Sequence, residues 1–233
     1  TTYDESTYIT DVLTEHAVEW LDERDEDQPF FKYLSHKAVH SQFQPAERHQ
    51  GLYQEEAIVY PPSFDTPNYG TPELPTGSAD SEPLRGRDYY GERRIPDWVK
   101  QQRESWHGVD YMYHGDINFE EFFQRYTETL MGIDDSVGAV LDYLDANGLA
   151  EDTLVIYMGD NGFSFGEHGL SDKRHFYEES AKVPLLVRWP SRLQGGAAIE
   201  SLVQNIDIAP TILEAAGLSM PSHMQGASFI PQF

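Results

Sequence analysis

The apolar run Leu154–Met158, followed at once by a glycine-rich polar loop, restricts the fold of this chain more than any other feature. Its length is that of a buried strand, and a helical pattern of apolar residues precedes it over Phe119–Asn147. Val183–Trp189 and Phe30–Leu34 also have the length and apolarity of strands. Strands that alternate with helices favour an α/β sandwich with a mainly parallel sheet flanked by helices. In such sheets, ligands bind beyond the strand ends.

Two helices are expected on the amino-terminal side of that strand. Apolar residues at helical spacing predict one over Asp11–Glu26, with Thr10 as its cap. The longer helix over Phe119–Asn147 is expected to stop at Gly148, because glycine readily adopts the conformation that ends a helix.

The carboxyl-terminal part has shorter elements. Leu202–Ile206 is expected to form a short strand. Asp207 is expected to cap a short helix, Ile208–Ala216, which Gly217 closes.

Composition sets limits on function. The chain has 233 residues, enough for one large domain over 1–233 with a sizeable core. Its net charge of -24 argues against nucleic-acid binding, which needs a basic surface, and gives no sign of attraction to anionic membranes. The chain has no cysteine, so disulfides and zinc-thiolate sites are excluded, and no apolar run approaches the length of a membrane span. The sequence leaves the oligomeric state open.

The segment 60–106 differs from the rest of the chain. It is rich in proline and lacks apolar periodicity, although it contains aromatic residues that can pack. Long irregular loops in compact domains tend to be functional, so we interpret it as an insertion that selects substrate, wraps the domain or contacts a partner.

The loop after Leu154–Met158 contains the groups of a metal and anion site. Asp160 and Asn161 offer the oxygen ligands that suit Ca²⁺, and glycines allow the backbone to turn closely. Lys173 adds a cation thirteen residues after Asp160. Asp-Asn-Gly is also ordinary turn material, so these residues alone leave a simple turn open.

This loop resembles the second active-site signature of the sulfatase family, in the alkaline-phosphatase-like superfamily. Flanking segments resemble that family in the same order, and the resemblance covers most of the chain except roughly 60–106: PFFKYLSHKAVH (29–40), RYTETLMGIDDSVGAVLDYLDANGL (125–149), YEESAKVPLLVRWP (177–190) and NIDIAPTILEAAGL (205–218). The implied fold is an alkaline-phosphatase-like sandwich, here incomplete at the amino terminus.

The resemblance implies a role for individual residues. Asp160 and Asn161 would complete a Ca²⁺ site, and Asp160 could also assist deprotonation of the nucleophile. Lys173 would bind the sulfate, and His40 would bind it and protonate the leaving alcohol, for which a histidine pKa is suitable. Near His40 the chain departs from the commoner Ala-Pro-His-x-Pro, because Val39 and Gln42 replace the two prolines.

Other candidates have weaker support. His107 and Arg174 are candidate substrate-binding residues, with a solvated surface position as the alternative. His168 is expected to support the loop rather than react. His36 is either a second functional histidine or a packing residue. Arg103 belongs with Arg174 as a possible contact for further anionic groups.

In this family the nucleophile is a formylglycine made from the Cys or Ser of a Cys/Ser-x-Pro-x-Arg motif near the amino terminus. Ser81 begins a matching SEPLR, but it follows the histidine segment instead of preceding it and lacks the expected continuation. We therefore expect the nucleophile upstream of this chain, and the isolated chain to be inactive. A secreted, periplasmic or lysosomal location is implied by resemblance, without a signal peptide in these residues.

The implied function is release of sulfate from a sulfated carbohydrate by a calcium-dependent sulfuric ester hydrolase. Two alternatives remain open at this point. One is a phosphate or phosphonate ester hydrolase of the same superfamily, although its second metal site would favour histidine at the place of Asn161. The other is a relative that binds sulfated glycan without cleaving it.

Overall fold

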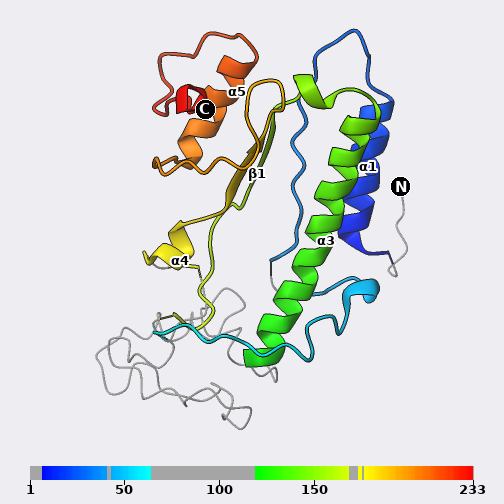
Figure 1. Cartoon of the computed structure of the whole chain (residues 1–233), viewed down its shortest axis with the longest axis vertical. Helices are drawn as coiled ribbons and strands as arrows, with labels where there is room; N and C mark the ends of the chain where they lie inside the picture. The colour runs from blue at the N-terminus through cyan, green and yellow to red at the C-terminus, as the bar shows by residue number, and fades with distance from the viewer. Residues whose placement is uncertain (1–6, 41–42, 64–118, 168–172, 175, 233) are drawn as a thin grey trace, which may run out of the picture. The chain divides into compact units, whose positions relative to one another are not determined.

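The computed structural model describes residues 7–40, 43–63, 119–167, 173–174 and 176–232 (Figure 1). Contacts divide the chain into two compact units, the first formed by Thr1–Val140 and Gly159–Val183 and the second by Leu141–Met158 and Pro184–Phe233. Each unit is described by itself. The interpretation of 1–233 as one sulfatase-like domain stays a prediction, and most of the insertion at 60–106 lies outside the described residues.

Helix α1 spans Ile9–Asp22 and packs through Val12, Ala17 and Leu21, all of them buried. The expectation that Thr10 caps this helix is wrong: Tyr8 is the N-cap, and Thr10 lies fully buried in the first turn. The helix also ends earlier than Glu26. Negative charge is unfavourable at a helix carboxyl end, and carboxylates crowd the sequence from Asp22 onward.

Helix α3 spans Phe119–Ala146; its residues up to Val140 belong to the first unit, where the helix lies beside α1 (Figure 1). Its end confirms the predicted stop: Gly148 has a φ of 68°, and the Leu149 N–H donates to the Leu144 carbonyl at 2.9 Å. This is the Schellman arrangement, which satisfies a carbonyl that the helix itself leaves unpaired.

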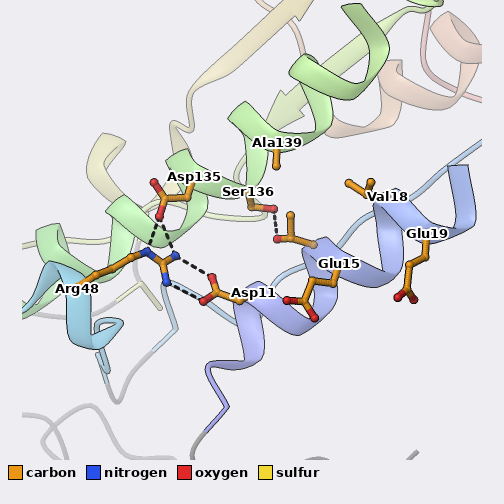
Figure 2. Close-up of a pocket in the computed structure, with 9 residues that line it drawn as sticks. Asp11, Glu15, Val18, Glu19, Arg48, Asp135, Ser136 and Ala139 are labelled. Carbon is orange, nitrogen blue, oxygen red and sulfur yellow. Dashed lines mark hydrogen bonds and ion pairs between the residues drawn. The ribbon is translucent and has the colours of Figure 1, made fainter. Parts of the chain in front are cut away.

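An ion-pair network joins α1 and α3 through Arg48, which lies in the short 3-10 helix η1 (Glu47–His49). The guanidinium donates to both Asp11 oxygens, at 2.7 and 2.8 Å, and to Asp135 at 2.8 Å (Figure 2). These two carboxylates raise the pKa of Arg48. A groove of about 520 Å³ beside the network is lined by α1 and α3 and contains none of the candidate site residues.

The second unit contains strands β1 (Val155–Met158) and β2 (Leu185–Arg188), close to the expected positions. They pair antiparallel, with Val155 opposite Arg188 and Met158 opposite Leu185. The expectation of a mainly parallel sheet is therefore not met within the described residues. The segment Phe30–Leu34, which was expected to be a strand of that sheet, is extended but has no strand partner among them.

Helix α5 spans Ile208–Ala215, as expected, and Gly217 closes it with a φ of 70°. Asp207 is its N-cap by position, but its carboxylate accepts hydrogen bonds from the Gln204 and Ala227 N–H groups. The strand expected at Leu202–Ile206 is absent, because that capping interaction folds the chain into the 3-10 helix η5 (Asn205–Asp207). The remaining short helices are η3 (Ala150–Asp152), α4 (Glu178–Ala181) and η6 (Ile230–Gln232).

The carboxyl-terminal tail passes very close to η5. An added Cβ at Gly226 would lie 2.0 Å from the Ile206 carbonyl oxygen, so only glycine fits there. Within the described part of the chain, every helix is too short or too polar to span a lipid bilayer.

Candidate metal and anion site

The candidate site begins directly after β1, where the backbone turns at Asp160, Asn161 and Gly162. The Gly162 N–H donates to the Ser180 carbonyl at 2.9 Å. A Cβ at Gly162 would lie 2.0 Å from the Glu179 carbonyl oxygen. The loop is therefore pressed against α4 at a position that accepts no side chain.

The side chain of Asn161 is held in one orientation. Its Nδ2 donates to the Gly162 carbonyl at 2.6 Å, while the Asn161 N–H donates to Asp160 Oδ1 at 2.9 Å. The two side-chain oxygens that these hydrogen bonds do not use are Asn161 Oδ1 and Asp160 Oδ2. A turn of this kind is the simple alternative anticipated from the sequence, and it leaves those two oxygens able to act as metal ligands.

An aromatic cluster anchors the following residues of the loop to α3. Phe165 lies 4.5 Å from Tyr126 and 5.3 Å from Phe123, measured between ring centroids, and Phe163 lies 6.3 Å from Phe122. Phe43 joins the cluster at 4.8 Å from Phe122. Since such pairs contribute beyond simple area burial, the cluster stabilises the loop position on the helix.

The next part of the loop turns at Gly166, which has a φ of 95°. Glu167 accepts a hydrogen bond from the Phe165 N–H at 2.6 Å. Residues 168–172 lie outside the described residues, so the prediction for His168 is not addressed. His107 and Arg103 also lie outside them.

Lys173 and Arg174 belong to the same unit as Asp160. The Lys173 side chain is half-buried, and Arg174 and Asp160 are exposed. In the described residues no ion pair joins Lys173 to Asp160, so the structure leaves convergence of the two on one anion as a prediction.

His40 is exposed and lies at the end of a turn in which its N–H donates to the Lys37 carbonyl at 2.8 Å. His36, four residues earlier, is half-buried instead, and its Nε2 lies 3.0 Å from Ser136 Oγ on α3. The geometry favours the packing interpretation of His36. It ties the histidine segment to α3.

A chain of polar groups continues from His36 into α1. Thr14 Oγ1 lies 2.6 Å from Ser136 Oγ and 2.7 Å from the Thr10 carbonyl. Every donor is satisfied if His36 Nε2–H donates to Ser136, Ser136 to Thr14, and Thr14 to Thr10. His36 Nδ1 then carries a lone pair, and this buried atom has no hydrogen-bond partner among the described residues. Burial lowers the pKa of His36.

Sequence reasoning missed Ser136, which is only 2% exposed and holds His36 in place. The available signal was its register: Ser136 lies three residues after the buried Ile133, on the apolar face of α3. A lone polar residue on such a face needs a hydrogen-bonding partner.

The described residues fit part of a calcium site. They contain no group of three or more His, Cys, Asp or Glu side chains placed to hold a metal. Ca²⁺ takes about 6–8 oxygen ligands, and Asp160 and Asn161 provide oxygens of the required kind. The donor chemistry of these two residues therefore suits calcium.

Comparison with known proteins identifies the family. The sulfatase family model matches residues 1–218. An N-acetylglucosamine-6-O-sulfatase of Bacteroides thetaiotaomicron is 30% identical to the chain, in a match that covers 97% of this chain and 46% of that protein.

Solved structures share the fold. A protein in complex with its substrate D-glucosamine-2-N,6-O-disulfate gives a TM-score of 0.72 at 25% identity, covering 96% of this chain and 51% of that one. A phosphonate monoester hydrolase from Silicibacter pomeroyi gives a TM-score of 0.68 at 19% identity, covering 98% and 41%, which shows the fold alone. The chain spans about half the length of these relatives. Because the family model covers nearly the whole sequence, the chain belongs to the sulfatase family, within the alkaline-phosphatase-like superfamily of α/β proteins.

Proposed function

We propose that the protein to which this chain belongs is a carbohydrate sulfatase that releases sulfate from the 6-O position of a glucosamine-type sugar. The observation that carries this proposal is the sulfatase family match over 1–218, which includes the Asp160–Gly162 loop. The preference for the 6-O position is supported by a relative named N-acetylglucosamine-6-O-sulfatase and by the structural neighbour that holds glucosamine disulfate.

Residues of this chain have distinct roles in the proposed reaction. Lys173 binds a sulfate oxygen and offsets the charge that accumulates there in the transition state. His40 contacts the sulfate and donates a proton to the leaving sugar oxygen, and its exposed position allows a substrate to reach it. Arg174 and His107 are proposed to contact further groups of the sugar.

Calcium is the proposed cofactor, with Asp160 and Asn161 among its ligands. When bound, the ion would neutralise negative charge on the sulfate. This proposal is supported by Asp160 Oδ2 and Asn161 Oδ1, which the hydrogen bonds of the turn do not use. It is also supported by the close packing of Gly162 against the Glu179 carbonyl, which restrains the shape of the turn. The nucleophile, a formylglycine by family resemblance, is proposed to come from outside this chain.

The proposal is tested by supplying the other half of the domain. The chain is mixed with the portion of the Bacteroides thetaiotaomicron relative that it does not match, and sulfate release from glucosamine 6-O-sulfate is measured with calcium and with a calcium chelator. We expect release only in the mixture with calcium, and Lys173→Ala should abolish it. The control is Lys182→Ala, which removes a lysine that follows α4.

The alternative functions give different results in the same assay. A phosphonate or phosphate ester hydrolase, favoured only by the shared fold, would cleave those esters faster than sulfate esters. A non-catalytic relative would bind the sulfated sugar and release nothing. Either outcome would contradict the sulfatase proposal. A location outside the cytoplasm is proposed from a further relative that is named an extracellular sulfatase.

A further inference from the structure

The turn that contains His40 is tied to the first unit at its entry. Residues 37–40 form this turn, in which the His40 N–H donates to the Lys37 carbonyl at 2.8 Å. His36 comes directly before the turn, and its Nε2 lies 3.0 Å from Ser136 Oγ on α3. Because only three residues separate His36 from His40 in the sequence, the position of the His36 ring restricts where the His40 backbone can lie.

The hydrogen bonds beyond His36 can run in one direction only. Thr14 Oγ1 lies 2.7 Å from the Thr10 carbonyl, which can only accept, so the hydrogen of the Thr14 hydroxyl is used there. The hydrogen bond of 2.6 Å between Thr14 and Ser136 must then take its hydrogen from Ser136. Ser136 has no second hydrogen, and it therefore accepts from His36 Nε2–H. A backbone carbonyl of α1 thus determines the tautomer of a ring in another segment.

This support lies between two helices that are joined to one another. Ser136 is 2% exposed and points from α3 toward α1, where Thr14 accepts its hydrogen bond (Figure 2). Arg48 links the same two helices beside the groove that Ser136 and Thr14 also line. Burial lowers the pKa of His36, so the ring is neutral at neutral pH and keeps the tautomer that Ser136 requires. The His36 ring is therefore held in one orientation and one protonation state.

We propose that His36 and Ser136 are positioning residues that hold the His40 turn in the place from which His40 donates its proton. This inference rests on the proposed sulfatase function, in which His40 protonates the leaving sugar oxygen. A proton donor must lie within hydrogen-bond reach of the atom that it protonates, so a small shift of the turn slows the chemical step. Neither His36 nor Ser136 contacts the substrate in this proposal, and both act through His40.

NMR tests the support in the chain itself, without any need for activity. The ring nitrogens of His36 should show the hydrogen on Nε2, and solvent exchange of the His40 N–H should become faster by about tenfold in Ser136→Ala. Thr129→Val is the matched control, because Thr129 is also 2% exposed on α3 but its hydroxyl donates to the Arg125 carbonyl of the same helix. A hydrogen on His36 Nδ1, or unchanged His40 exchange in Ser136→Ala, overturns the proposal.

Kinetics test the role in the reaction, in the mixture of the chain with the unmatched portion of the Bacteroides thetaiotaomicron relative. Two substrates are compared: glucosamine 6-O-sulfate, and an aryl sulfate whose phenol leaves readily without a proton. We expect Ser136→Ala and His36→Leu to lower kcat for the sugar sulfate by about tenfold or more, with a smaller loss for the aryl sulfate and little change in KM. His36→Gln should keep most of the activity, because its amide still donates to Ser136. Thr129→Val should match the parent.

The outcomes separate this inference from the sulfatase proposal. Equal losses of kcat on both substrates, or a change in KM alone, would mean that His36 and Ser136 support only the fold, and would overturn the inference. A parent mixture that releases no sulfate contradicts the sulfatase function and with it any role in that reaction, whereas exchange at His40 still reports on the support of the turn. If Ser136→Ala does not fold, the pair His36→Leu and His36→Gln provides the same comparison in both experiments.

Discussion

At the residue scale, the most constrained position of the candidate site is one without a side chain. Gly162 donates its N–H to Ser180 and lies where the Glu179 carbonyl excludes a Cβ. Its own carbonyl accepts the amide of Asn161, so any displacement of Gly162 also moves the oxygens of Asp160 and Asn161. The glycine thus positions groups that it does not itself provide.

We expect Gly162→Ala to weaken calcium binding in the completed domain by about 10–100-fold, the usual effect of disturbing the groups around a metal ligand. Calcium titration by calorimetry measures it. Gly138→Ala is the control, because a Cβ at Gly138 on α3 meets nothing within 4 Å. An unchanged calcium affinity in Gly162→Ala would show that the loop is not a metal site.

His36 makes stability depend on pH. Its folded-state pKa lies below the ordinary value of 6.5, because burial disfavours the charged ring. The unfolded chain therefore binds the proton more readily. The contribution of neutral His36 to the stability of the folded protein is complete above about pH 6.5. It decreases as the pH falls from there through the lowered pKa of His36.

His36→Gln should remove this part of the pH dependence, while its amide still donates to Ser136. Urea unfolding from about pH 7 to about pH 5.5 should show a smaller loss of stability than in the parent, at a cost of about 1 kcal/mol at neutral pH. Equal slopes in the variant and the parent would contradict the assignment.

At the element scale, an arginine that lies between two carboxylates forms an ion-pair bridge from α1 to α3. Arg48 contacts Asp11 and Asp135, and all three side chains are partly exposed. Solvent screening limits the value of such a network, although bidentate geometry favours it.

Arg48→Gln should lower the free energy of unfolding by about 1 kcal/mol, and the loss should shrink at high salt. Thermal or urea unfolding at low and high ionic strength measures both effects. Arg125→Gln removes an ion pair with Glu121 inside α3 alone and should cost less. A larger loss in Arg125→Gln would mean that the bridge between helices is unimportant.

The sequence predicted elements well where local chemistry determines them. α3 and its stop at Gly148, α5 and its stop at Gly217, and both strands fall close to their expected positions. The cap at Thr10 and the strand at Leu202–Ile206 were wrong, because burial in one case and a side-chain capping interaction in the other outweighed local pattern.

The described residues contain one antiparallel strand pair, so the expected mainly parallel sheet stays a prediction. For the candidate site, the sequence identified the loop but not its supports. Folding alone brings the aromatic residues of α3 to Phe165 in the loop, and it brings Ser136 to His36. Whether His40 and Lys173 meet at one anion stays a prediction.

At the scale of the whole molecule, large apolar side chains remain at the surface in both units, among them Phe31, Tyr33 and Leu202. The chain spans about half the length of the relatives that it matches, so the activity of a whole sulfatase stays a proposal for it.

The isolated chain should therefore show no turnover of a chromogenic aryl sulfate with calcium, because the nucleophile and the other metal ligands are not expected within it. A long incubation with sensitive detection of sulfate provides the measurement. Calcium-dependent turnover by the chain alone, with the Lys173→Ala variant inactive, would show that these residues already form a complete active site.

The tight crossing at Gly226 limits what this position of the chain accepts. Since no side chain fits between this residue and the Ile206 carbonyl, any larger amino acid here would force the last residues of the chain along another path.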